Sequence, residues 1–409
     1  MNNTLQTYKG KTLSSVPQGY VPFLLAEFIE NGTNDILYIA GSGAELEEVA
    51  NVVHFIAPEA EVLKFPAWDT VPYDRVSPSA GIMGERVETL IKLAFEPNGK
   101  KKRLIVASVG SAIQKLPPKK IFLNAQRVFK KGGVFLFNDF LHYASINGYQ
   151  RVEQVMEPAE YAVRGDIIDI FPSSAAEPIR IDLFDDTIEK IRVFDPVTQR
   201  TVREIESYEI GLAGEVVLDS NTVENFRNAY REAFGAAGLR DELYESISNG
   251  VKYIGYENWL PFFYDEPLLT LFDYLPSADV ILGANVPVAL GAKTESIRDY
   301  YTARLEALNN LTADETVYRP IKPEGLYLTQ EDFDAMMRAK KAIFLSDLST
   351  PNDEKTQNLE VVPARDFSYT LKVSLENVYQ NLKDYSTWLS AARSTTCARP
   401  RSVPTSWKA

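Results

Sequence analysis

Residues of the kind that bind phosphate follow the first strand-like run of this 409-residue sequence. The segment AGSGAELEE places Gly41 and Gly43 where the backbone can approach a phosphate at the start of a helix. A nucleotide-binding loop also needs Gly-Lys-Ser/Thr, which the segment lacks, and the dinucleotide pattern G-x-G-x-x-G is incomplete. Glu45, Glu47 and Glu48 would stabilise the start of a helix and repel phosphate. We therefore interpret this degenerate phosphate-loop position as a turn with a helix cap, and we predict no bound cofactor for this chain.

The rare residue types exclude several other kinds of site. Cys397 is the sole cysteine, which excludes an intrachain disulfide, a cysteine zinc site and a redox pair. His54 and His142 are the two histidines, and we predict structural roles for both, which disfavours catalytic triads and histidine metal sites. Paired acids occur in FDD and YDEP, but Asp185 and Asp186 fall between two strand-like runs, where aspartate commonly forms turns. We predict neither a catalytic residue nor a metal site.

The strand-like run IRIDLF combines an apolar face with a charged one. Side chains alternate along a strand, so its isoleucines face a core while Arg180, Asp182 and Phe184 share the opposite face. In the next run, TIEKIRVF, the side chains of Lys190, Arg192 and Phe194 share a face in the same way. Arginine and phenylalanine on a polar sheet face are typical of a protein-binding patch. From the spacing alone, the alternative that Phe184 merely covers a neighbouring loop remains open.

Arg164 precedes Gly165 in the run EPAEYAVRGDIIDIF, directly before a further strand-like run. An Arg-Gly pair at this position indicates a turn that projects the guanidinium group. If the neighbouring strands pair, Arg164 joins Arg180 on one surface. An ordinary surface arginine is the alternative.

The elements that carry these residues indicate an α/β fold with two kinds of sheet. Strand-like runs alternate with helical segments in the first part, which predicts a parallel sheet covered on both faces. These runs are DILYIA (35–40), EVLKF (61–65) and RLIVAS (103–108). The closely spaced runs DIIDIF, IRIDLF and TIEKIRVF follow, and their short connections predict antiparallel pairing. Helices and the strand-like runs DVILGA and KAIFLS come next, so the small module is expected to be an insertion within one larger domain.

The composition is that of a globular protein, with 45% hydrophobic and 24% charged residues. A chain of 409 residues is expected to form several domains. The 43 Lys+Arg against 56 Asp+Glu give a net charge of −13, which disfavours an extended nucleic-acid-binding surface. No apolar run reaches the length of a membrane span and the N-terminus lacks a signal-peptide core, so we expect a cytoplasmic protein without membrane contact.

Three long segments resemble the UvrB-homology region of the bacterial transcription-repair coupling factors (Mfd). They are FPAWDTVPYDRVSPSAGIMGERVETL, EPAEYAVRGDIIDIFPSSAAEPIRIDLFDDTIEKIRVFDPVTQRT and GYENWLPFFYDEPLLTLFDYLP, and their order and spacing agree with that family over residues 10–370. The resemblance implies a degenerate RecA-like domain that is split by a small α+β module, and this module binds the repair protein UvrA. It places UvrA-contacting residues at Arg164, Arg180 and Phe184, which favours the binding patch.

The resemblance also implies a division of the chain. We expect residues 1–125 to form the first part of the UvrB-like domain and residues 213–350 to complete it. Residues 126–212 would be the inserted UvrA-binding module, and residues 351–390 a linker with the incomplete start of a third domain. The Ser/Thr/Pro/Arg-rich stretch 391–409 is expected to be disordered, and a truncated or frameshifted end is our hypothesis.

Two departures from UvrB itself limit what the resemblance implies. The phosphate loop is degenerate, and the stretch between Asp74 and Gly81 has no room for UvrB's DNA-inserting hairpin. The family's RNA polymerase-binding domain, and its ATP- and Mg-dependent motor on double-stranded DNA, lie beyond this chain. We therefore expect a UvrA-recruiting adaptor in transcription-coupled nucleotide excision repair rather than an enzyme. The alternatives are a nucleotide-dependent DNA translocase or helicase, and a stand-alone DNA-binding module.

Overall fold

The computed structural model describes residues 4–95, 102–122, 126–310 and 317–361, together with Gln380 and Lys383. The chain divides into two compact units, residues 1–361 and 362–409. Gln380 and Lys383 are helical, whereas the rest of the helix expected in SLENVYQNLKDYSTWL and the stretch 391–409 lie outside the described residues. No helix in the described part of the chain is long and apolar enough to cross a membrane.

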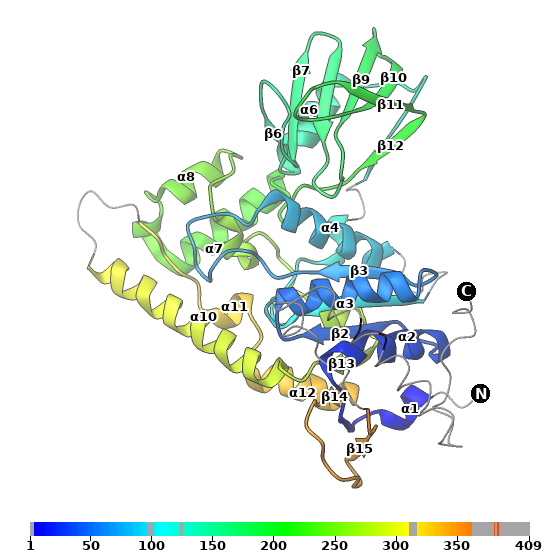
Figure 1. Cartoon of the computed structure of the whole chain (residues 1–409). Helices are drawn as coiled ribbons and strands as arrows, with labels where there is room; N and C mark the ends of the chain where they lie inside the picture. Colours follow the sequence, from blue (N-terminus) through cyan, green and yellow to red (C-terminus); the bar gives the residue numbers. More distant parts are fainter. Residues whose placement is uncertain are drawn as a thin grey trace. The chain divides into compact units, whose positions relative to one another are not determined.

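A seven-stranded sheet forms the centre of the first unit (Figure 1). Its strand order is β15-β1-β14-β13-β2-β4-β3, and every neighbouring pair is parallel. The strands are β1 (Thr12–Ser14), β2 (Ile36–Ala40), β3 (Glu61–Phe65), β4 (Arg103–Ser108), β13 (Asp279–Leu282), β14 (Ile343–Leu345) and β15 (Thr356–Asn358). The expected parallel sheet is confirmed. β1 and β15 are not among the expected strands, because three residues are too few to display a strand's alternation.

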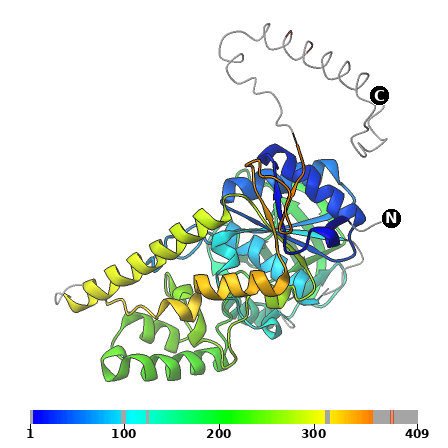
Figure 2. The same cartoon turned by 90° about the horizontal axis from the view of Figure 1, so that it is seen from below.

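Helices cover both faces of this sheet, as parallel strands require. Alternate residues of β2 belong to different cores: Leu37 and Ile39 to one, Tyr38 and Ala40 to the other. The core that contains Tyr38 is closed by α1 (Thr4–Tyr8), α2 (Val21–Asn31) and α3 (Gly43–Ile56). The core that contains Leu37 is closed by α4 (Ala80–Phe95), α5 (Val109–Ala112), α7 (Ser220–Gly238), α8 (Glu242–Ser248), α9 (Leu271–Tyr274), α10 (Val286–Asn309), α11 (Pro323–Leu326) and α12 (Gln330–Lys340). Figure 2 shows the strands between the α2 and α3 helices on one side and α12 on the other.

Three short 3-10 helices complete the elements of this part of the chain. They are η1 (Gln18–Tyr20), η2 (Lys119–Phe122) and η3 (Tyr256–Phe262). In η3 the indole of Trp259 is almost fully buried and donates to the Arg319 carbonyl at 2.9 Å, which fixes the segment after α10 against the core.

The small module contains a six-stranded sheet of order β11-β10-β9-β8-β7-β6. Its strands are β6 (Gln150–Arg151), β7 (Glu160–Arg164), β8 (Ile167–Phe171), β9 (Ile179–Phe184), β10 (Thr187–Phe194) and β11 (Thr201–Ile205). All neighbours are antiparallel except β6 and β7, so the expected antiparallel pairing is confirmed. The helix α6 (Phe137–Ile146) packs on one face, where Phe140 and Tyr143 join the isoleucines of β8 and β9 in a buried core. Strands β5 (Arg127–Lys130) and β12 (Ser207–Ile210) form a separate antiparallel pair.

The module lies in sequence between β4 and β13, two strands that both neighbour β2 in the large sheet. The large sheet is therefore assembled from segments on both sides of the module. Arg86 of α4 and Glu215, which follows the module, form a fully buried ion pair in which Arg86 Nε donates to Glu215 Oε1 at 2.5 Å. Gly84 of α4 lies against the module's Ser173 carbonyl, because an added Cβ would lie 1.9 Å from that oxygen. These two contacts connect α4 with the turn between β8 and β9 and with the segment that follows the module.

Candidate protein-binding face

The outer face of the module is the face of the six-stranded sheet opposite α6, and it carries Arg164, Asp169, Arg180 and Phe184. The pairing register places Asp169 of β8 directly opposite Arg180 of β9. The isoleucines of IRIDLF are fully buried in the module core, whereas Arg180 and Phe184 alternate with them and point to the outer face. The alternation expected for this strand is confirmed.

The carboxylate of Asp169 binds two arginines at once. Arg180 donates from Nε to Oδ1 at 2.6 Å and from Nη2 to Oδ2 at 2.9 Å, a two-point contact that fixes the plane of its guanidinium. Arg164, at the end of β7, donates from Nη2 to the same Oδ2. The Asp169 side chain is 0% exposed, against 14% for Arg180 and 48% for Arg164. Hydrogen bonding to Asp169 holds the pKa of Arg180 above its ordinary value.

Arg180 is more buried than the strand alternation predicts. Its guanidinium lies over the ring of Phe194, 4.6 Å from the centroid, and Gln199 Oε1 accepts a further hydrogen bond at 3.3 Å. Phe194 does share this face, but it is 0% exposed and packs with Val155 in a small second core. The expectation that Phe194 belongs to an exposed patch is wrong, because the chain around Val155 and the turn that bears Gln199 cover this half of the sheet.

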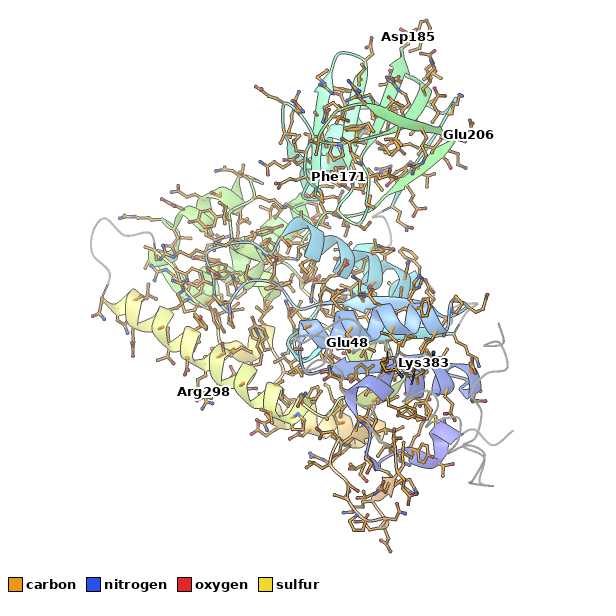
Figure 3. All side chains as sticks on the ribbon, viewed as in Figure 1. Glu48, Phe171, Asp185, Glu206, Arg298 and Lys383 are labelled. Carbon is orange, nitrogen blue, oxygen red and sulfur yellow. The ribbon has the colours of Figure 1, made fainter. Side chains whose placement is uncertain are left out.

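Phe184 lies at the uncovered end of the outer face. Its side chain is 72% exposed, so it does not serve mainly to cover a loop. Asp185 and Asp186 follow it and make the expected tight turn into β10, with Asp185 in the left-handed region at a φ of 52°. Asp185 lies at the tip of the module and Phe171 near the other end of the same sheet (Figure 3). The pairing of β9 with β10 fixes the backbone at Phe184, so the position of this residue on the sheet does not depend on a partner.

Sequence reasoning missed Asp169, and it missed the ion pairs that organise this face. Asp169 lies between two isoleucines in DIIDIF, and only its strand parity marks it as an outer-face residue. Asp182 accepts a hydrogen bond from Arg192 Nη2 across the β9–β10 pair in the same way. A charged residue inside an otherwise apolar strand is the available signal, but its partner is known only once the register is known.

The phosphate-loop position after β2 is occupied by a side chain of the chain itself. Ser42 caps α3, and its Oγ accepts the Glu45 N–H at 3.2 Å, so the expected turn and helix cap are confirmed. Glu45 is 7% exposed; its Oε2 accepts the Gly41 N–H at 3.0 Å and its Oε1 accepts the Tyr38 hydroxyl at 2.5 Å. A backbone donor that a phosphate would need is therefore bound to a carboxylate.

Side chains also pack closely against the glycines on both sides of this loop position. The loops after β2 and β13 diverge to opposite faces of the sheet, which is the usual place for a ligand in such folds. A Cβ on Gly41 would lie 2.8 Å from the Asn285 Cβ, and one on Gly283 would lie 2.6 Å from the Tyr38 hydroxyl. A Cβ on Gly43, the second glycine of the motif, would meet no atom within 4 Å, so this position is open.

The remaining candidate groups serve local structure. In the YDEP segment Asp265 and Glu266 pair with Lys120 at 3.3 and 2.9 Å on the surface. His54 and His142 are exposed on α3 and α6, and no group of three or more metal-ligating side chains occurs in the described ranges.

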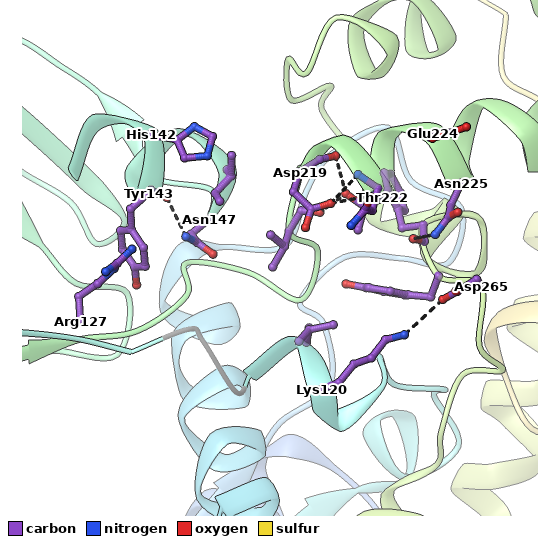
Figure 4. A pocket seen from close by; sticks show the side chains of 16 residues that line it. Lys120, Arg127, His142, Tyr143, Asn147, Asp219, Thr222, Glu224, Asn225 and Asp265 are labelled. Carbon is purple, nitrogen blue, oxygen red and sulfur yellow. Dashed lines mark hydrogen bonds and ion pairs between the residues drawn. The ribbon is translucent and has the colours of Figure 1, made fainter. Parts of the chain in front are cut away.

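His142 borders a polar pocket of about 600 Å³ between α6 and the start of α7 (Figure 4). The pocket's polar groups are used within the chain. Asp219 caps α7 by accepting the Asn221 and Thr222 N–H groups at 2.9 and 2.8 Å. Asn147 donates from its side chain to the Tyr143 carbonyl at 2.8 Å.

Comparison with known proteins links the outer face to a described domain. Residues 128–215 match the family model of the UvrB interaction domain, which contains all three candidate residues. Similar curated proteins are transcription-repair-coupling factors. The one from Rickettsia bellii is 31% identical over 84% of this chain and 30% of its own length. The one from Haemophilus influenzae is 31% identical over 86% of this chain and 30% of its own length. The one from Escherichia coli is 29% identical over 82% of this chain and 28% of its own length.

The chain spans about 30% of the length of these relatives. It is homologous to the N-terminal region of transcription-repair-coupling factors and includes a UvrB interaction domain.

Proposed function

We propose that this chain recruits UvrA through the outer face of its module, as the recruiting arm of a transcription-repair coupling factor in nucleotide excision repair. The observation that carries the proposal is the 72% exposure of Phe184 on the sheet that also holds Arg164 and Arg180, within the matched domain. A large exposed aromatic beside arginine is the composition of protein-binding hot spots.

The three residues contribute in different ways. Phe184 supplies apolar area that a partner removes from water. Arg164 is half exposed and spends one nitrogen on Asp169, so its other donors can meet a carboxylate or carbonyl of UvrA. Arg180 is mostly enclosed, and its contribution is to hold Asp169, which in turn holds Arg164.

Asp169 is a positioning residue in this proposal. Its buried charge is stabilised by two guanidinium groups, and it brings them together from different strands. A long arginine side chain loses conformational entropy when a partner orders it, and an arginine that is already tethered loses less. The tether therefore prepares Arg164 for binding.

We further infer that the large sheet is a degenerate RecA-like domain formed by residues 1–125 and 213–350, with 126–212 as the inserted UvrA-binding module. Glu45 bound to the Gly41 amide supports the view that this chain itself is not an ATPase. In this account RNA polymerase, double-stranded DNA, ATP and Mg are partners of other parts of a full-length, cytoplasmic coupling factor.

A pull-down with purified UvrA tests the proposal. The wild-type chain should retain UvrA, and a chain with Arg164, Arg180 and Phe184 all replaced by alanine should not. A matched triple variant on the same module should bind like the wild type, for which exposed Arg203, Val197 and Val202 are suitable. Equal retention by all three chains would refute the assignment.

A further inference from the structure

A second exposed apolar side chain lies in the same row as Phe184. Val134, in the segment between β5 and α6, is 71% exposed and forms an isolated antiparallel bridge with Thr187 of β10. The Ile188 N–H donates to the Gly133 carbonyl at 2.9 Å, and the Phe135 N–H donates to the Asp186 carbonyl at 2.7 Å. These bonds flank the Val134–Thr187 pair, so the two side chains lie close together on one face.

Thr187 connects this bridge to the candidate site. It pairs with Phe184 across the β9–β10 turn, and directly opposed residues in a sheet point to the same face. The side chains of Phe184, Thr187 and Val134 therefore form one row across the outer face. Phe135, the next residue after Val134, is 2% exposed and packs in the module core, which confirms that Val134 points outward.

We propose that Val134 belongs to the docking face and that UvrA covers it together with Phe184. This inference rests on the proposed function and extends its site from the six-stranded sheet to the segment at 133–135. Single exposed apolar residues are ordinary on protein surfaces. Phe184 and Val134 are both more than 70% exposed and lie in one row inside the matched domain, on either side of exposed Thr187, and we call this row the strip.

The surroundings of the strip define the chemistry of the surface that fits it. The exposed carboxylates of Asp185 and Asp186 lie in the turn between Phe184 and Thr187. The complementary surface of UvrA is an apolar depression with basic side chains at its border, since charges of opposite sign across an interface fix its register.

Val197 provides a matched control for Val134. It is 75% exposed, on the same module, in the turn after β10. Val134 bridges to the first residue of β10, so the strand separates the two valines by roughly 25 Å at about 3.3 Å per residue. Both side chains are exposed, so replacing either with serine should leave the fold unchanged, which circular dichroism and thermal unfolding would verify.

The test is calorimetric titration of UvrA with the full chain and its variants. Val134→Ser replaces two methyl groups with a hydroxyl and should weaken binding by about fivefold or more, and Val197→Ser should not change it. Unchanged affinity in Val134→Ser, with a large loss in Phe184→Ala, overturns the role of Val134 and leaves the proposed function standing. Absence of binding by the wild type overturns both.

Light scattering addresses the other occupant of the strip, a second copy of this chain. The wild type and Val134→Ser should have the same molar mass in solution. A wild-type dimer that Val134→Ser dissociates would assign the strip to self-association and overturn the proposal.

Discussion

Arg164 and Arg180, on different strands of the module, donate hydrogen bonds to the same buried oxygen, Oδ2 of Asp169. The shared carboxylate makes one unit of two residues that sequence alone presents as separate candidates. It also divides their roles, because Arg164 remains 48% exposed and Arg180 is 14% exposed.

Removing the charge of Asp169 should impair both binding and stability. Asp169→Asn leaves two guanidinium groups without a counter-charge, one of them mostly buried, so the free energy of unfolding should fall by about 3 kcal/mol. UvrA affinity should fall by about tenfold as Arg164 loses its tether. Urea unfolding and calorimetric titration measure the two effects.

Asp182→Asn is the control for this prediction, because the hydrogen bond of Asp182 goes to Arg192, and Asp182 acts on Arg180 only through its charge, a smaller effect than that of Asp169. It should retain more affinity for UvrA than Asp169→Asn. A folded Asp169→Asn protein with wild-type affinity would contradict the positioning role.

The two arginines should respond differently to alanine. Arg164→Ala should reduce UvrA affinity about tenfold or more, and it should lower the free energy of unfolding less than Arg180→Ala does, because buried Asp169 keeps its two-point contact with Arg180. Arg180→Ala should reduce both quantities, because it leaves Asp169 with one partner and uncovers Phe194. Arg203→Ala, at a 52% exposed arginine paired with Glu177, should leave affinity unchanged. Identical stability of the Arg164 and Arg180 variants would argue against this division.

The contact between α4 and the module should be sensitive to a single methyl group. Gly84→Ala places a Cβ 1.9 Å from the Ser173 oxygen, so the helix or the turn must move. We expect the free energy of unfolding to fall by about 2 kcal/mol or more. Gly81→Ala, in the same helix with nothing within 4 Å, should have no destabilising effect. Thermal unfolding of the pair measures the difference, and equal melting temperatures would contradict the packing.

Glu257 should make stability depend on pH. It is 5% exposed, and burial raises its pKa from 4.5 to about 7, although Lys252 and a 2.8 Å hydrogen bond from Ser77 oppose the shift. The folded state therefore binds a proton more tightly than the unfolded state, and stability falls as pH rises from 4.5 to 7.

Replacing Glu257 with glutamine should remove this dependence of the unfolding free energy on pH. Between pH 5.5 and pH 8 the wild type should lose about 2 kcal/mol of unfolding free energy relative to Glu257→Gln. Glu206→Gln, at a side chain that is 85% exposed, should keep the wild-type slope. Urea unfolding at the two pH values measures these free energies. The same change in unfolding free energy for the wild type and Glu257→Gln would refute the shifted pKa.

Hydrolysis of ATP by the purified chain, with and without DNA, should stay at background. The Gly41 amide is bound to Glu45, and the side chains of Tyr38 and Glu45 pack closely against Gly283. A coupled phosphate-release assay measures turnover, and activity that depends on the chain's concentration would favour the translocase alternative.

The sequence supports the prediction of elements more strongly than that of their contacts. Apolar runs such as DILYIA predict buried parallel strands because both faces of such a strand are covered, and β2 has this environment. The alternation in IRIDLF likewise predicts which side of β9 carries Arg180 and Phe184. The very short strands β1 and β15 leave no such pattern.

The site itself depends on long-range pairing that no local pattern contains. The burial of Phe194 comes from a segment near Val155, and the row that joins Val134 to Phe184 passes through Thr187 of another strand. Asp169 acquires its two arginines only through the register of β7, β8 and β9. The alternation along a strand predicts which face of the sheet a residue lies on. Whether that face is exposed to solvent depends on contacts with segments that are distant in the sequence.

Calorimetric titration of UvrA with the wild-type chain and with Phe184→Ala measures how much Phe184 contributes to UvrA binding. Phe184 is 72% exposed, so its replacement should leave the melting temperature unchanged and isolate the effect on binding. The account predicts a loss of about 2 kcal/mol or more, roughly 30-fold in affinity. Equal affinity of the two chains for UvrA would contradict it.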